Sequence, residues 1–201
     1  EECLAIKPDL VFLWDEAWFG FAHWSPFLRP RTAMGAATAI EKWLASPEAL
    51  EQYEAQQQDL GDNPSDETLL MTRLIPDPRQ VRLRVYHTNS RHKSMSAIRQ
   101  GSMILVRDVD FDTIEPQLHE AIFTHSTTSP NQQLIASLDV ARRQMELEGY
   151  GLVNNAIQIA LDIRYQINKN PLISRYFKLL GADEMIPKEF RESQFVDFLA
   201  P

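Results

Sequence analysis

Three polar clusters of the sequence hold residue types that could do chemistry. The first centres on Asp15, which directly follows the apolar run 10–14 and lies among aromatic side chains. Ligands of open α/β sheets bind at the carboxyl ends of parallel strands, so an aspartate there could hold a cationic ring nitrogen, a metal ion or a helix N-terminus. The structural alternative is an aspartate that caps a turn while the aromatic side chains pack in the core.

The second cluster surrounds Lys93, which follows the strand-like run 81–88 by a few residues. Ser90, His92 and Ser94 place hydroxyl and imidazole groups beside it. A lysine whose amine is kept unprotonated by burial or by nearby cations can form a Schiff base. The structural alternative is a solvated lysine in a loop.

The third cluster is the run of hydroxyl side chains at residues 126–129, at or before a predicted helix start. Ser129 is expected to be the N-cap, with Pro130 at the first helical position and Gln132 completing a capping box. A helix N-terminus presents free N–H groups and the positive end of the helix dipole, which suits a phosphate group. The structural alternative is a well-capped helix that binds no ligand.

The elements that would position these clusters predict an α/β fold. Strands are expected from two short apolar runs and one period-two alternation, over residues 10–14, 81–88 and 102–108. The first of them is expected to be a parallel strand buried on both faces. Helical spacing and capping residues predict helices over residues 33–45, 46–61, 130–147, 151–168 and 171–181, with a loop over 61–67.

Composition argues against several classes of function. Acidic residues number 28 and basic residues 20, and the net charge of −8 argues against a nucleic-acid partner. No apolar run approaches the roughly 20 residues of a membrane span. Cys3 is the single cysteine, so no disulfide can form within the chain and a reducing, cytoplasmic location is expected. His87 and His92 lack the spacing of metal ligands, so no metal site is predicted.

Together the clusters offer the parts that pyridoxal 5'-phosphate (PLP) requires: a Schiff-base lysine, a carboxylate for the pyridinium nitrogen and a phosphate-binding helix start. In this order they resemble the bacterial fold-type I PLP-dependent ornithine/lysine/arginine decarboxylases. The matching motifs are DEAW at 15–18, SRHK at 90–93 and STTSP at 126–130. The resemblance is scattered over residues 10–168, excluding roughly 36–80, and Arg91 stands where the family usually has a small threonine.

The resemblance implies a role for each site residue. Lys93 would form the internal aldimine with PLP, and Asp15 would keep the pyridine nitrogen protonated while carbon dioxide leaves and a quinonoid intermediate forms. The proton returned to the substrate would come from Lys93 or His92, and this choice stays open. The residues implied to bind the cofactor are Lys93, Asp15, Ala17, Trp18, Ser90, His92, Thr127, Thr128 and Ser129, of which the last three approach the partner subunit's active site in the family dimer.

The resemblance also implies the organisation of the chain. Residues 1–35 and 81–168 would belong to a PLP-binding large domain with a mostly parallel sheet flanked by helices. Residues 36–80 would form a helical insertion, and residues 169–201 would begin a linker or C-terminal region. The chain begins without Met, so we expect an internal piece of a longer protein or a trimmed form of one, and the family's phosphate cup would precede it.

The expected function is the decarboxylation of lysine, ornithine or arginine to the corresponding amine by a cytoplasmic lyase. The expected partners are the amino-acid substrate and further copies of the chain, in a homodimer or higher homo-oligomer with a shared active site. Two alternatives stay open. One is another fold-type I reaction such as amino transfer, and the other is a non-catalytic fragment that serves as an interaction module.

Overall fold

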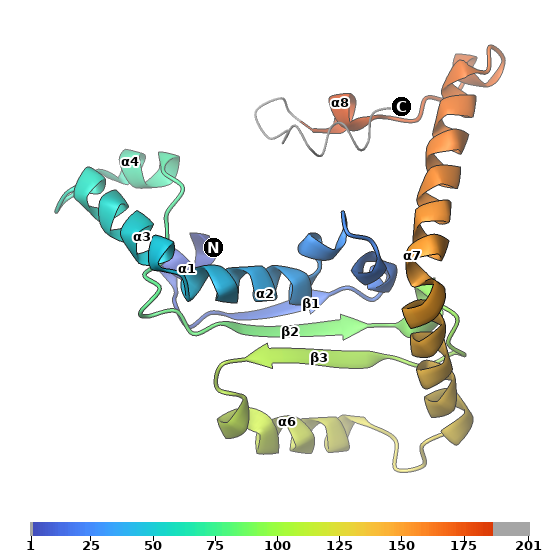
Figure 1. Ribbon diagram of the computed structural model, residues 1–201, viewed down its shortest axis with the longest axis horizontal. Helices are drawn as coiled ribbons and strands as arrows, with labels where there is room; N and C mark the ends of the chain where they lie inside the picture. The colour runs from blue at the N-terminus through green and yellow to red at the C-terminus, as the bar shows by residue number, and fades with distance from the viewer. Residues whose placement is uncertain (1, 187–201) are drawn as a thin grey trace. The chain divides into compact units, whose positions relative to one another are not determined.

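The structure of the protein is a computed structural model that describes residues 2–186 (Figure 1). The chain divides into two units, with the boundary between Leu147 and Glu148. The first unit holds a three-stranded sheet and most of the helices, and the second holds the later part of a long helix and the segment that follows it. All of the predicted site residues lie in the first unit.

The sheet joins β1 (Val11–Asp15), β2 (Arg84–Asn89) and β3 (Met103–Asp108) in the order β1-β2-β3. These strands lie close to their predicted positions, and with the helices they agree with an α/β fold. β1 and β2 are parallel, whereas β2 and β3 are antiparallel. The mostly parallel sheet that was expected is therefore not found in the described residues. Only the one-turn helix α5 (Arg91–Ser94) lies between β2 and β3, and it is too short for the crossover that a parallel pair needs.

The hydrophobic core of the first unit lies between α2 (Ala33–Leu44) and one face of the sheet. Its buried members are Leu4, Ala33, Ala37, Leu83 and Val85. The other face of β1 is open in the described residues, where the Leu13 side chain is 76% exposed. The expectation that β1 is buried on both faces is therefore wrong for this part of the chain, because β1 is an edge strand and α2 covers one face only.

Capping residues explain several helix boundaries. The helices that the structure describes are α1 (Glu2–Ile6), α2, α3 (Pro47–Leu60), α4 (Asp66–Met71), α5, α6 (Phe111–His125), α7 (Gln132–Lys169) and α8 (Ala182–Met185), with 3₁₀ turns at Gly20–Trp24, Arg29–Arg31 and Ile173–Arg175. Gly61 ends α3 in the left-handed region, at φ +68°, as the sequence predicts. α4 begins inside the predicted loop because the Ser65 hydroxyl caps it by accepting a hydrogen bond from Thr68 N.

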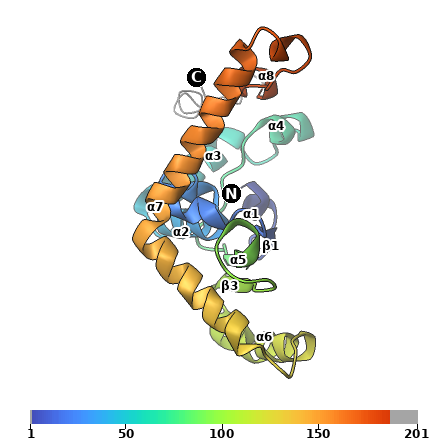
Figure 2. The ribbon, with the colours of Figure 1, turned by 90° about the vertical axis from the view of Figure 1, so that its right-hand side faces the viewer.

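Two helix predictions near the end of the chain are wrong. α7 is one uninterrupted helix (Figure 2) rather than two, since no proline interrupts residues 148–150. The helix predicted over 171–181 is reduced to the 3₁₀ turn at Ile173–Arg175. There the Asn168 side chain bonds both backbone groups of Leu179, which replaces helical hydrogen bonding. No helix in residues 2–186 combines the length and apolar composition that a membrane span requires.

Candidate active site

Two of the three predicted clusters meet at the carboxyl ends of β1 and β2. Asp15 ends β1 and pairs with Thr88 in the parallel ladder, so the carboxyl ends of both strands lie side by side. α5 follows β2 directly, and Lys93 Nζ on α5 lies 5.3 Å from the centroid of the Trp18 ring. The DEAW and SRHK motifs thus lie together, and residues 15–18 with 90–94 are called the strand-end site below.

Asp15 has an exposed carboxylate, and only one of its two oxygens accepts a hydrogen bond within residues 2–186. Its Oδ1 accepts a hydrogen bond from Ala17 N at 3.0 Å, which closes a tight turn. Within residues 2–186, no protein group donates a hydrogen bond to its other oxygen. The turn-capping role considered from the sequence is therefore real, and it still leaves one oxygen for a ligand.

Lys93 carries an exposed amine with no carboxylate at ion-pair distance in the described part of the chain. Its ammonium group lies over the ring of Trp18, a cation–π contact worth about 0.5–1 kcal/mol at an exposed site. This contact holds the amine beside the turn that follows Asp15. The amine is therefore held in place by the Trp18 ring, and no ion pair within residues 2–186 competes for it.

His92 is oriented by a backbone carbonyl. Its Nδ1 lies 2.8 Å from Gly101 O, and because a carbonyl only accepts, Nδ1 carries the proton. In this tautomer the lone pair of the ring is on Nε2. A side chain on Gly101 would require Leu138 to shift, since a Cβ there would lie 2.7 Å from Leu138 Cδ2.

One residue of the strand-end site, Glu16, is buried and forms with His87 and Asn89 a cluster that the sequence analysis missed, called the buried cluster. Their exposed fractions are 6%, 6% and 2%. Glu16 Oε2 lies 3.2 Å from His87 Nε2, and Asn89 Nδ2 donates to Glu16 O at 3.2 Å. The signal that could have found it is the alternation of β2, which places His87 and Asn89 on the same face as the core residue Val85.

Electrostatics keep the histidines near this cluster neutral. Burial lowers the pKa of His87 below its ordinary value, Glu16 offsets part of this effect, and the Arg91 guanidinium lowers the pKa further. Burial also lowers the pKa of His23, with Arg29 and Arg91 adding to the effect. The Arg91 side chain therefore lies among imidazoles, and its buried Nε has no hydrogen-bond partner in the described residues.

The third cluster lies in the exposed loop between α6 and α7, and its predicted cap is wrong. Asn131 caps α7, because its Oδ1 accepts from Gln133 N at 3.0 Å and Leu134 N at 3.3 Å. Ser129 instead donates its backbone N–H to Thr127 Oγ1 at 3.1 Å. Among the described residues no hydrogen bond joins the side chains of Thr127, Thr128 or Ser129 to the strand-end site.

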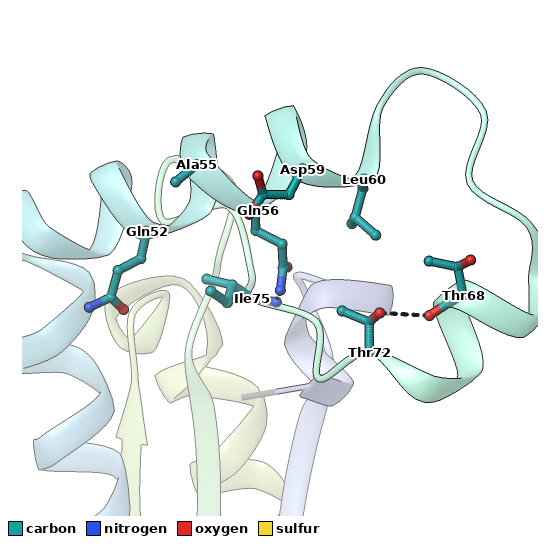
Figure 3. Close-up of a pocket in the computed structure, with 8 residues that line it drawn as sticks. All are labelled: Gln52, Ala55, Gln56, Asp59, Leu60, Thr68, Thr72 and Ile75. Carbon is teal, nitrogen blue, oxygen red and sulfur yellow. Dashed lines mark hydrogen bonds between the residues drawn. The ribbon is translucent and has the colours of Figure 1, made fainter.

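A hollow of about 510 Å³ lies elsewhere in the first unit, between α3 and α4. Both helices lie past the amino-terminal ends of β1 and β2, away from the strand-end site (Figure 1). Gln56 and Thr72 point into it, and Thr72 Oγ1 donates to Thr68 O at 2.6 Å (Figure 3). Gln56 Nε2 donates to Arg73 O, and its Oε1 accepts from Ile75 N. These polar groups hold the local backbone together.

Comparisons with known proteins point to one family. Residues 71–194 match the family model "Orn/Lys/Arg decarboxylase, major domain". The chain is 39% identical over 156 residues to the lysine decarboxylase LdcA of Pseudomonas aeruginosa, covering 77% of this chain and 15% of that protein. It is 36% identical over 86 residues to the inducible lysine decarboxylase of Escherichia coli, covering 42% of this chain and 12% of that protein.

A solved structure has a similar fold. The crystal structure of the Francisella novicida lysine decarboxylase LdcF matches with a TM-score of 0.50 and 24% identity, covering 84% of this chain and 17% of that one. The chain thus spans less than a fifth of the length of each of these relatives. The family-model match includes Lys93 and the loop after α6, whereas Asp15 lies before it. The described residues contain no group of three or more His, Cys, Asp or Glu side chains that could hold a metal ion.

Proposed function

Since the chain belongs to the Orn/Lys/Arg decarboxylase family, we propose that it carries part of the active site of a PLP-dependent decarboxylase. The substrate is a basic amino acid, lysine, ornithine or arginine, and the products are the corresponding amine and carbon dioxide. One observation carries the proposal. The DEAW and SRHK motifs, far apart in sequence, lie at the same end of the parallel strands, with Lys93 Nζ 5.3 Å from the Trp18 ring centroid.

The residues at the strand-end site fit PLP. The Lys93 amine has no ion-pair partner within residues 2–186, and Asp15 keeps an oxygen that no protein group occupies there. The buried hydroxyl of Ser94 also lacks a hydrogen-bond partner in this part of the chain. An unpartnered buried polar atom is costly unless a ligand or water satisfies it. An amine, a carboxylate and a hydroxyl are the donor and acceptor types that the cofactor's aldehyde, ring nitrogen and phosphate need.

When bound, PLP supplies an electron sink for the charge that develops at the substrate α-carbon as carbon dioxide leaves. Lys93 would hold the cofactor through its Nζ. The Asp15 carboxylate keeps a proton on the ring nitrogen, because an anion beside it favours the charged form. Lys93 Nζ or His92 Nε2 returns a proton to the α-carbon.

The remaining site residues shape the pocket around these groups. Ala17 would leave room for the cofactor ring, Trp18 would line the site, and Ser90 would contribute to holding the phosphate. Thr127, Thr128 and Ser129 act across a subunit interface in a homodimer or larger homo-oligomer, which agrees with their exposure and their lack of hydrogen bonds to the strand-end site.

The proposal extends to the organisation of the chain. Residues 1–35 and 81–168 belong to the fold-type I large domain, and residues 36–80 form a helical insertion. Residues 169–201 begin the next region, of which 187–201 lie outside the described residues. The enzyme acts in the cytoplasm. The position of α3 and α4 past the amino-terminal strand ends supports the insertion, because it keeps them away from the strand-end site.

The test is to locate the cofactor on the protein as expressed from its native gene. The protein is incubated with PLP, reduced with borohydride and mapped by peptide mass spectrometry. We expect a pyridoxyl group on Lys93, its loss in Lys93→Ala, and its retention in Lys42→Ala, a control on an exposed face of α2. A pyridoxyl group on another lysine, or on none, would overturn the proposal. Carbon dioxide release, rather than keto-acid formation, from lysine, ornithine or arginine separates decarboxylation from amino transfer.

A further inference from the structure

We propose that Glu16 is a positioning residue, whose buried carboxylate fixes the turn that aims Asp15 and Trp18 at the cofactor. The inference rests on the proposed function, since it names a residue that supports the same site. Glu16 lies inside the DEAW motif, between Asp15 and Ala17, yet its side chain points away from solvent and is 6% exposed. It is the buried member of a motif whose other polar residue, Asp15, is exposed.

Every polar group of Glu16 is held by a different neighbour. Its N–H donates to Thr88 O at 3.1 Å, which extends the β1–β2 pairing by one residue. Its carbonyl accepts from Asn89 Nδ2 at 3.2 Å. Its Oε1 accepts from Ala33 N at 2.5 Å, and its Oε2 lies 3.2 Å from His87 Nε2. Glu16 therefore ties β2 and the start of α2 to the turn after β1.

The charge of Glu16 suits this position. Ala33 is the first residue of α2, so its N–H is one of the free donors at a helix N-terminus, where a negative side chain is favoured. Both carboxylate oxygens face donors, because a neutral His87 can donate from Nε2. Glutamine has nearly the same shape but only one acceptor oxygen. Its NH₂ group can face His87 only if the imidazole proton moves from Nε2 to Nδ1, and the negative charge at the start of α2 is lost in either orientation.

A displacement of Glu16 would also move the residues next to it in the chain, which carry the functional side chains of the site. Asp15 and Ala17 flank it and are joined by the hydrogen bond from Ala17 N to Asp15 Oδ1. The next residue, Trp18, carries the ring that lies beside Lys93 Nζ. The turn is also confined from the side, because a Cβ on Gly20 would lie 2.6 Å from Asn89 Oδ1. A shift of Glu16 therefore changes the direction of the Asp15 carboxylate relative to Lys93.

The experiment compares Glu16→Gln with Asp77→Asn in the protein expressed from its native gene. Asp77 is also a buried carboxylate, 9% exposed, and it accepts hydrogen bonds from Arg79 N, Arg79 Nε and Gln80 Nε2. None of its hydrogen bonds reaches the strand-end site, so it is a matched structural control. For each variant we would measure PLP affinity, the absorption band of the bound cofactor as a function of pH, and urea unfolding.

We expect both variants to unfold at lower urea, and Glu16→Gln alone to change the cofactor readouts. Its PLP affinity should fall by about 10- to 100-fold, the usual cost of losing a residue that orients a binding group, and the pH at which the absorption band changes should shift. Equal affinity and equal spectra for the two variants would overturn the inference. If Glu16→Gln does not fold, His87→Leu serves in its place, because it leaves Glu16 Oε2 without its partner. An affinity for His87→Leu equal to that of Asp77→Asn would then overturn the inference.

The proposed function can fail separately. If the wild-type protein fixes no PLP at Lys93, the proposed function is wrong whatever the variants do. If the wild type fixes PLP there and Glu16→Gln matches the control, only the role of Glu16 is wrong.

Discussion

The strand-end site and the hollow between α3 and α4 are two polar regions of the same unit, and their hydrogen bonding differs. In the hollow, Gln56 bonds the backbone of Arg73 and Ile75, and Thr72 bonds Thr68 O. In the strand-end site and the buried cluster, several buried polar atoms have no partner in the described residues: His87 Nδ1, Asn89 Oδ1, Arg91 Nε and Ser94 Oγ.

The difference favours the strand-end site as the place of chemistry, because the proposal rests on unsatisfied buried polar atoms rather than on open volume. A buried polar atom without a partner costs about 1–3 kcal/mol, so a fold that keeps several together needs a compensating ligand or water. The hollow is open and about 510 Å³ in volume, and the side chains of Gln56 and Thr72 in it bond the local backbone. We therefore assign chemistry to the strand end and a structural role to the hollow.

The largest expected effect is a difference in reaction rate between two variants, each of which removes one carboxylate from one of the two regions. Asp15→Asn should still bind PLP through Lys93 but lose at least about 100-fold in decarboxylation rate, the usual cost of removing one preorganised electrostatic partner. Asp59→Asn, on the wall of the hollow, should leave the rate unchanged. Steady-state kinetics of both variants, each loaded with PLP, measure the difference. Equal decarboxylation rates for the two variants would contradict the assignment of chemistry to the strand-end site.

The hollow should show its role in stability. Gln56→Ala removes the acceptor of Ile75 N and the donor to Arg73 O, and we expect the free energy of unfolding to fall by about 1–3 kcal/mol. Gln52→Ala, which lines the same hollow without a side-chain hydrogen bond in the described residues, should change it by less than about 0.5 kcal/mol. Urea unfolding gives both values. A loss of PLP affinity in Gln56→Ala would contradict the structural assignment.

The strand positions and the meeting of the two motifs could be predicted because their signals are local. Period-two alternation indicated β2, and a motif just after each strand predicted that Asp15 and Lys93 share one end of the sheet. The buried cluster could not be predicted in the same way. Glu16 meets His87 and Asn89 only when β1 pairs with β2, and a sequence pattern does not say which residues of two strands will face each other.

The buried cluster also predicts how stability depends on pH. The folded-state pKa of His87 is lowered from its ordinary value of 6.5, chiefly by burial, so below pH 6.5 the unfolded chain binds a proton that the folded chain does not. Stability is therefore lost as the pH falls from 6.5 toward the lowered pKa, by at most about 1.4 kcal/mol per pH unit for one proton. Buried His23 adds to this loss with the same sign.

His87→Gln tests this dependence because it removes the titrating ring. Its urea midpoint should fall less between pH 7 and pH 5 than that of the wild type. His119→Gln, at an exposed position on α6, is the control and should follow the wild type. A wild-type midpoint that does not change over this range would show that His87 takes up its proton equally well in the folded state.

The smallest expected effect concerns the loop before α7, where the sequence pattern pointed to the wrong cap. Ser-Pro favoured a start at Ser129, but the Asn131 side chain accepts from two backbone N–H groups of the first turn. Asn131→Ala should therefore cost about 1 kcal/mol and speed hydrogen exchange at Gln133 and Leu134. Ser129→Ala should leave both unchanged, because its hydroxyl makes no capping hydrogen bond within residues 2–186. The reverse result would mean that the hydroxyl run caps α7 after all, and its proposed place at a subunit interface would lose its support.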